Sequence, residues 1–427
     1  MLRADYLARK MLCNNTADFW KEVKALNNCK PSLPSTVEGV SGADNIAALW
    51  RQHYSALFNC IKSEPYEDNL DMSNDTISVR THEVYEAIHR LSDNKSSGLD
   101  HITAEHLKHA SVRLAPLLAL CFTGFMIHGI LPDSMLCILL VPVMKDKAAK
   151  WGSSISAPFG VSNGVRQGGI LSPILFNLYV DDLSIQLRAC NTGCILGKAL
   201  INHLMYADDL VVFSPSSAGL QDLLNVCTEY GVQYDIEYNA AKSAVLICRT
   251  KQDKQLNFPL FKLAQKTLEV HKKVKYLGHF ITEQMNDDDD IYRQRCKLYV
   301  QANTIARKFS FCSLPVKVAL FKAYCTPLYT APLWSSYKQC SMQKLHVAYN
   351  DAMRILCRIP RSGSASQMFV AVGVWTFKAL LRKLMFNFRE RLDGSSNSII
   401  LALTDPVSGS RYSSSLRKHW LKCLCIY

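Results

Sequence analysis

The chain has 427 residues, 48% of them hydrophobic and 20% charged, with 49 Lys and Arg against 36 Asp and Glu. This composition excludes an intrinsically disordered chain and predicts two or three globular sub-domains with sizeable cores. The net charge of +13 favours a polyanionic partner, either nucleic acid or an anionic membrane surface.

The first residues contain no apolar segment of the kind that a secretory signal needs. The longest apolar stretch, Leu114 to Met144, is interrupted by His128 and by Pro132-Asp133, so a buried helix followed by a buried strand fits it better than a membrane span. We therefore expect no membrane partner and a cytoplasmic or nuclear location. The 16 cysteines follow no disulfide framework, which favours reduced thiols.

Helical spacing of apolar residues characterises the first part of the chain. Residues 1–60 are expected to be helical. Thr81 to Leu91 is expected to form a short helix, with Thr81 as its N-cap and one buried face formed by Val84, Ile88 and Leu91.

Further along, a helix is predicted to begin at Ser172-Pro173 and to run to about Cys190. Two short strands, His203–Tyr206 and Leu210–Phe213, should form a hairpin around Ala207-Asp208-Asp209. A helix capped by Ser217 should follow.

Strands are then expected over SAVLICR and VKYLGHFI, and basic helices from Asp287 onward. The acidic run Asp287–Asp290 fits the first turn of a helix, where negative charge is favourable.

The acidic hairpin tip is the first candidate for chemistry. Polymerases use carboxylates to hold a pair of divalent ions during phosphoryl transfer, and magnesium prefers oxygen ligands. An acidic pair in a turn is more often merely solvated, so the surrounding sequence has to decide. Gly168 and Gly169 would let a nucleotide approach a helix N-terminus, although they could equally serve only as the turn into that helix.

Four motifs occur in a fixed order: RQGGILSPILFNLY from Arg166, YADDLVVF from Tyr206, EYNAAKSAVLIC from Glu237, and VKYLGHFIT from Val274. They resemble the B, C, D and E motifs of reverse transcriptases from non-LTR (LINE-type) retrotransposons. These proteins are RNA-directed DNA polymerases, that is, nucleotidyltransferases of transposable elements. The resemblance covers most of residues 1–390.

The resemblance implies a role for each matched residue. Asp208 and Asp209 would be the catalytic residues and the metal ligands. The residues expected to contact the nucleotide and template are Arg166, Gln167, Gly168 and Lys242. The residues expected to form the primer grip are Tyr276, Leu277 and Gly278. The implied cofactor is Mg²⁺ and the implied partners are an RNA template and a DNA primer, with no small-molecule cofactor.

The implied fold is α+β: an incomplete right-hand, polymerase-like palm with a helical N-terminal extension and a helical thumb. The expected boundaries are an extension at 1–75, the start of the fingers at 76–150, a partial palm at 151–285, a basic thumb at 286–390 and a tail at 391–427. The family's A motif, with its essential Asp before an Ala-Phe-Asp run, is missing, as is an Arg-Pro-Ile fingers signature. Both belong at Lys150–Trp151, which indicates an internal deletion.

The family's endonuclease domain is also expected to be absent, because residues 1–60 resemble the connector that follows it. Two functions therefore stay open. One is a reverse transcriptase impaired by loss of the A-motif aspartate, and the other is a non-catalytic remnant that binds RNA or DNA. A helical membrane or scaffold protein would explain the apolar helices but not the ordered motifs.

Overall fold

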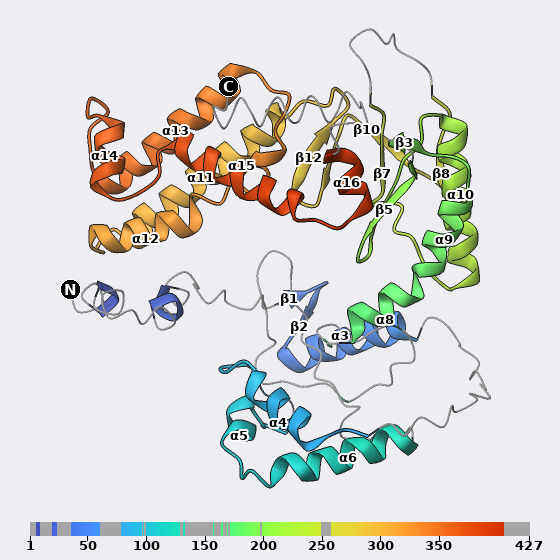
Figure 1. Ribbon diagram of the computed structural model, residues 1–427. Helices are drawn as coiled ribbons and strands as arrows, with labels where there is room; N and C mark the ends of the chain where they lie inside the picture. The colour runs from blue at the N-terminus through green and yellow to red at the C-terminus, as the bar shows by residue number, and fades with distance from the viewer. Residues whose placement is uncertain are drawn as a thin grey trace. The chain divides into compact units, whose positions relative to one another are not determined.

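The computed structural model of the chain forms two compact units, Lys30–Gly164 and Met1–Cys29 with Val165–Tyr427. Figure 1 shows their helices and strands. The structure describes residues 6–8, 19–23, 36–59, 78–95, 97, 100–128, 131–132, 157, 164, 169, 171–196, 199–248 and 258–404. The domain boundaries expected from the sequence differ from this division and stay a prediction.

The Lys30–Gly164 unit begins with a small antiparallel hairpin, β1 (Thr36–Val37) and β2 (Val40–Ser41), followed by helix α3 (Ala43–Phe58). The prediction of helix throughout residues 1–60 was therefore wrong at the hairpin. Its turn contains Gly39 at a φ of 82°, a conformation that suits glycine and closes a tight hairpin.

Three more helices are described in this unit: α4 (Thr81–Arg90), α5 (Ala104–Lys108) and α6 (Leu114–His128). Val84 and Ile88 of α4 pack on α6, which confirms two members of the predicted buried face. The third, Leu91, is 39% exposed because it lies just beyond the end of the helix. The N-cap is Arg80 rather than Thr81, and the Glu83 carboxylate accepts from the Arg80 N–H at 2.9 Å.

Helix α6 confirms the predicted helix at the start of the long apolar stretch, whereas the strand expected after it lies outside the described residues. Several apolar side chains of α6 are exposed, including Leu117 and Leu120. In the ranges that the structure describes, none of the helices combines the length and the apolar character that crossing a bilayer requires.

Residues 171–286, called here the strand-rich region, lie in the other unit. Its elements are α8 (Ser172–Tyr179), α9 (Asp181–Ala189), β3 (Cys194–Leu196), β4 (Ala199–Ile201), β5 (His203–Tyr206), β6 (Asp209–Val212), α10 (Ser217–Gln233), β7 (Ala244–Leu246), β8 (Lys262–Leu263), β9 (Lys266–Thr267), β10 (Glu269–His271), β11 (Lys273–Tyr276) and β12 (His279–Thr282). Each described strand pairs with one other: β7 with β10 in parallel, and the rest as antiparallel hairpins. Mixed helix and short strands agree with the expected α+β class.

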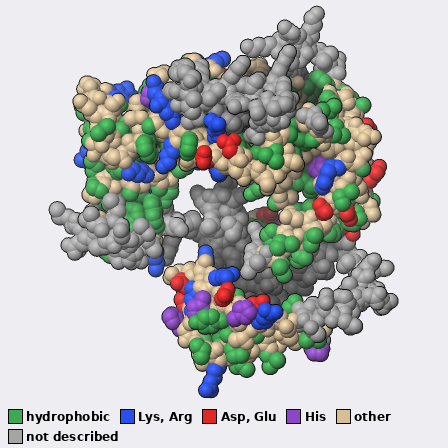
Figure 2. Space-filling view, in the orientation of Figure 1, with side chains coloured by type: hydrophobic (Ala, Val, Ile, Leu, Met, Phe, Trp, Pro, Cys, Tyr) green, Lys and Arg blue, Asp and Glu red, His purple; other side chains and the backbone are tan. Residues whose placement is uncertain are grey.

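The single helix predicted from Ser172 to about Cys190 is two helices, α8 and α9, which separate at Val180. Asp181 and Asp182 occupy the first turn of α9, where negative charge favours a new helix N-terminus. Leu183 and Leu187 are buried, but Ile174, Leu175 and Leu178 of α8 are more than half exposed. They form the hydrophobic patch (green) over α8 in Figure 2.

Helix α10 supplies much of the core of the strand-rich region, where Leu223, Leu224 and Cys227 are buried. Its N-cap is Ser216 rather than Ser217. Ser216 has extended backbone angles, and its Oγ accepts from the Gly219 N–H at 3.1 Å. Serine at that position satisfies an amide that the helix itself leaves unpaired.

Residues 287–404, called here the helical region, contain α11 (Asp288–Lys308), α12 (Leu314–Tyr324), the 3₁₀ turn η1 (Ala331–Leu333), α13 (Gln339–Cys357), α14 (Ala365–Ala371), α15 (Phe377–Asp393) and α16 (Ser398–Thr404). The predicted helical character and the acidic first turn of α11 are both confirmed. The core of this region also buries Leu7, Phe19 and Val23 from the start of the chain.

The ten cysteines among the described residues are free thiols. Cys227 lies in the core of the strand-rich region and Cys325 in that of the helical region. Burial raises the pKa of both thiols to about 12, so both stay protonated at neutral pH.

Candidate active site

The predicted acidic hairpin is present as β5 and β6, whose register pairs His203 with Val212 and Tyr206 with Asp209. Because side chains alternate along a strand, Met205 and Leu210 turn toward the core while Tyr206 is 64% exposed. Strand β6 begins at Asp209, one residue earlier than predicted.

Asp208 lies in the turn and Asp209 is the first residue of β6, and both side chains are exposed. The other turn residue, Ala207, has a φ of 52°, in the left-handed region that a side chain disfavours. Such outliers persist where the surrounding structure holds them, and they are common at functional sites. The hairpin thus presents two adjacent carboxylates on a tight turn.

The predicted primer-grip residues lie on a second hairpin, β11 and β12, in which Tyr276 pairs with His279. Its turn is Leu277-Gly278, with φ angles of 43° and 82°. Burial and the negative charge of Asp209 both raise the pKa of Tyr276. Two residues from separate sequence motifs, Tyr276 and Asp209, are therefore electrostatic neighbours.

Of the remaining predicted site residues, Lys242 is the one that the structure describes. Lys242 is exposed in the turn before β7, where its N–H donates to the Asn239 carbonyl and side-chain oxygens at 3.0 and 3.1 Å. Among the described residues, no contact joins Lys242 to the two aspartates. Arg166, Gln167 and Gly168 lie outside the described residues, as does the Lys150–Trp151 join.

The two carboxylates at the tip of the β5–β6 hairpin could supply some of the ligands of a divalent metal ion. Asp208 and Asp209 supply carboxylate oxygens, the ligands that magnesium prefers, on a turn open to water. Within the described ranges, no group of three His, Cys, Asp or Glu side chains is arranged to hold a metal ion. The observed residues therefore fit part of a ligand set.

A buried polar chain that the sequence did not reveal anchors the base of β5. The Asn202 side chain donates to the carbonyls of Leu187 and Thr192 at 2.5 and 2.9 Å, and its Oδ1 lies 2.8 Å from His203 Nδ1. His203 Nε2 lies 2.8 Å from Ser184 Oγ. Burial and the charge of Arg188 lower the pKa of His203, which keeps the ring neutral at pH 7. The sequence feature that could have revealed this group is the polar pair Asn202-His203, which stands between the apolar residues Ile201 and Leu204.

A second group missed from the sequence holds the primer-grip hairpin. Arg293 of α11 donates from Nη2 to the Gly278 carbonyl at 2.6 Å and also pairs with Asp290. The acidic run gave no signal for this role, because an ordinary helix N-terminus explains it equally well.

A profile of the family described as "Reverse transcriptase (RNA-dependent DNA polymerase)" matches residues 111–281, a range that includes the β5–β6 hairpin and all of the β11–β12 hairpin except Thr282. The chain contains a reverse transcriptase domain. The resemblance to that family found in the sequence is thereby confirmed.

The curated relatives are polyproteins and polymerases of mobile elements. The chain is 38% identical over 92 residues to the Pol polyprotein of retrotransposable element R2DM from Drosophila melanogaster, covering 22% of this chain and 8% of the relative. It is 23% identical over 278 residues to the RNA-directed DNA polymerase from mobile element jockey of Drosophila funebris, a match that covers 61% of this chain and 29% of the relative. It is 44% identical over 64 residues to the Pol polyprotein of retrotransposable element R2 from Nasonia vitripennis, a match that covers 15% of this chain and 6% of the relative. The matches span less than a third of each relative's length.

Proposed function

We propose that this reverse transcriptase domain binds an RNA template and a DNA primer and extends the primer poorly. The observation that supports the site is the tight β5–β6 hairpin that presents the exposed carboxylates of Asp208 and Asp209, near enough to Tyr276 for the charge of Asp209 to contribute to its raised pKa. Asp208 and Asp209 would hold magnesium, which supplies charge neutralisation for phosphoryl transfer when bound. Tyr276, Leu277 and Gly278 would support the primer strand, while Lys242, Arg166, Gln167 and Gly168 would serve the nucleotide and template.

Impaired catalysis is proposed because the sequence lacks the family's A motif. The acidic residues that could replace its aspartate have other surroundings: Asp181 and Asp182 begin α9, and Asp100 accepts from the Ile102 N–H at 3.0 Å. Asp290 is fully buried among hydrogen-bond donors. With one carboxylate missing, stabilisation of the transition state should suffer more than binding.

Nucleic-acid binding is supported by the basic character of the helical region. On the face that Figure 2 shows, Lys and Arg side chains (blue) lie over these helices. Arg354 and Arg361 both pair with Asp351, at 3.2 and 3.4 Å, so their charge is partly neutralised. Arg358, Lys378 and Lys383 are exposed. These exposed cations suit a phosphate backbone and predict an affinity that falls steeply with salt.

A primer-extension assay on an RNA template with magnesium tests the catalytic part. We expect extension reduced on the order of 100-fold relative to an intact relative, an estimate based on the loss of one preorganised stabilising group. Residual extension should vanish in Asp208→Ala and persist in Asp222→Ala, a matched change of an exposed aspartate on α10. Extension at the rate of the intact relative would contradict the proposed impairment.

The alternative function is a non-catalytic remnant that binds nucleic acid. It is supported by the same exposed cations and by the net charge of +13. It predicts salt-dependent binding of a primer–template duplex together with no extension that depends on Asp208. A salt-independent affinity would contradict nucleic acid as the partner in both cases.

A further inference from the structure

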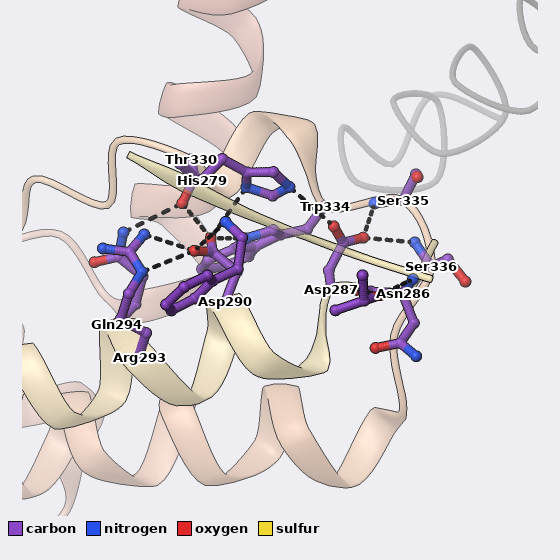
Figure 3. Close-up of polar contacts among 12 residues, drawn as sticks. His279, Asn286, Asp287, Asp290, Arg293, Gln294, Thr330, Trp334, Ser335 and Ser336 are labelled. Carbon is purple, nitrogen blue, oxygen red and sulfur yellow. Dashed lines mark hydrogen bonds and ion pairs between the residues drawn. The ribbon is translucent and has the colours of Figure 1, made fainter. Parts of the chain in front are cut away.

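Asp290 is a fully buried carboxylate at the junction of α11 with the β11–β12 hairpin (Figure 3). Its Oδ2 accepts from Thr330 Oγ1 at 2.5 Å and from Trp334 Nε1 at 2.9 Å. Its Oδ1 accepts from the Phe280 N–H at 3.3 Å and from Arg293 Nη2 and Nε at 2.6 and 2.9 Å. Both oxygens are therefore fully engaged.

Such engagement explains how a charge persists in the interior. Burial alone would raise the pKa of Asp290, but the adjacent ring of His279 and hydrogen bonds from Thr330, Trp334 and Arg293 hold it well below its usual range. His279 Nδ1 lies 3.3 Å from Oδ2 of this carboxylate. Removing one partner of a buried ion pair leaves the other charge uncompensated, so Asp290 and Arg293 depend on each other.

Arg293 extends this buried centre to the tip of the hairpin. Its Nη2 donates to the Gly278 carbonyl at 2.6 Å, and its guanidinium lies 5.5 Å from the centre of the Phe280 ring. The turn that receives this hydrogen bond contains Leu277 at a positive φ of 43°, a conformation that needs support from its surroundings. A planar guanidinium can hold a carboxylate and a carbonyl at once, whereas the single ammonium of lysine is a point charge.

We propose that Asp290 and Arg293 are positioning residues that clamp the Tyr276-Leu277-Gly278 turn onto helix α11 and so fix the point where the primer end rests. The positioning role rests on the proposed function, because it supposes that this turn supports a primer. The clamp itself is a property of the free protein. The two can therefore be tested separately on the full chain.

The first test follows hydrogen exchange at the Phe280 amide, which points at Asp290 rather than at β11. Arg293→Lys keeps the positive charge but loses the planar guanidinium that bonds Asp290 and the Gly278 carbonyl at once. We expect hydrogen exchange at the Phe280 amide to become about tenfold faster, which is the size of effect expected for the loss of one hydrogen bond to a charged group. Asp290→Asn should have a larger effect. Because it could also unfold the region, Arg293→Lys is the deciding variant.

Arg354→Lys is the matched control for that exchange measurement. Arg354 also pairs with the aspartate three residues before it and donates to a glycine carbonyl, Gly363 at 3.2 Å, but on α13. It should leave exchange at Phe280 unchanged. Unchanged exchange at Phe280 in Arg293→Lys, or equal acceleration in both variants, would overturn the clamp.

The second test uses a primer–template duplex with 2-aminopurine at the primer 3′ end. Arg293→Lys should change the fluorescence of the bound primer end while the overall dissociation constant changes less than about threefold. Faster exchange at Phe280 with an unchanged primer-end signal would overturn the positioning role. If the unaltered chain binds no duplex, the proposed function fails, and the positioning role with it, whereas the exchange result still decides the clamp.

Discussion

In the helical region, α11, α12 and α13 surround a core in which Leu345, Tyr349 and Phe321 are completely buried. In the strand-rich region, each described strand has one partner, and Leu204 and Tyr206 of β5 are 42% and 64% exposed. The first region buries its apolar faces within consecutive helices. The second consists mainly of hairpins of consecutive strands, and of its described pairs only the parallel pair of β7 and β10 joins strands apart in the sequence.

The two regions should respond differently to a change in the chain. A helical core built from neighbouring segments can keep its packing when a distant segment is altered. A strand-rich region loses pairing partners when any strand is lost, and its hairpins then rely on their own turns and anchors. The predictions below test whether the two regions differ in this way.

The largest effect is expected from Phe321→Ala in the helical core. Phe321 is fully buried and its ring lies 5.3 Å from that of Tyr349, so the cavity should cost ~3–5 kcal/mol of the free energy of unfolding. Urea unfolding followed by tryptophan fluorescence measures it, because the strand-rich region contains no tryptophan. Phe311→Ala, at a 50% exposed phenylalanine, should change stability by less than ~0.5 kcal/mol. Similar losses in both variants would contradict a well-packed helical core.

Next in size is Asn202→Ala at the base of β5. Asn202 is buried and donates to two carbonyls, so its loss should cost ~1–3 kcal/mol by leaving them unsatisfied. Hydrogen exchange of the β5 and β6 amides should accelerate while tryptophan-detected unfolding of the helical region stays unchanged. Asn225→Ala, at an exposed position of α10, serves as the control. An equal shift in the helical region would show that the two regions unfold together.

A smaller effect of opposite sign is expected from Ala207→Gly. Ala207 has a φ of 52°, so glycine should relieve ~1 kcal/mol of backbone strain and slow exchange in the β5–β6 hairpin. Ala218→Gly, in the first turn of α10, should instead destabilise by roughly 0.5–1 kcal/mol. Destabilisation by both changes would mean that the turn of the acidic hairpin is not strained.

The smallest effect concerns acid sensitivity, with one histidine in each region. Burial lowers the pKa of His203, as does the charge of Arg188, and burial with the charge of Lys378 lowers that of His346. Below about pH 6.5 the unfolded chain then binds more protons than the folded one, so stability should fall as the pH is lowered from 7.5 to 5.5.

Urea midpoints at these two pH values measure that sensitivity. His203→Gln should flatten the dependence for exchange in the strand-rich region only. A urea midpoint that rises as the pH is lowered would contradict the neutral state inferred for both histidine rings.

Much of the fold was predictable, because local physics governs it. The periodicity of α10, the acidic start of α11 and the acidic hairpin around Asp208 all follow from spacing within a few residues. The break at Val180 and the caps at Arg80 and Ser216 depend on backbone angles that neighbouring residue types do not fix.

The candidate site was predictable in its motifs but not in its connections. The sequence indicated Asp209 and Tyr276 separately, while the effect of the Asp209 charge on the pKa of Tyr276 depends on tertiary structure. Likewise, nothing local distinguishes Asp290 from Asp288 and Asp289, although Asp290 alone of the three is buried. Long-range partners decide the role of each residue in such a run.

The buried thiols of Cys227 and Cys325 have a practical consequence. The thiolate is the form that reacts with alkylating reagents. In the folded chain, Cys227 and Cys325 are protected from these reagents both by burial and by pKa values raised to about 12. Each becomes reactive only when its own core opens. Alkylation of each thiol therefore reports the opening of the core around it, and pulsed alkylation read by mass spectrometry would show which of the two regions opens first.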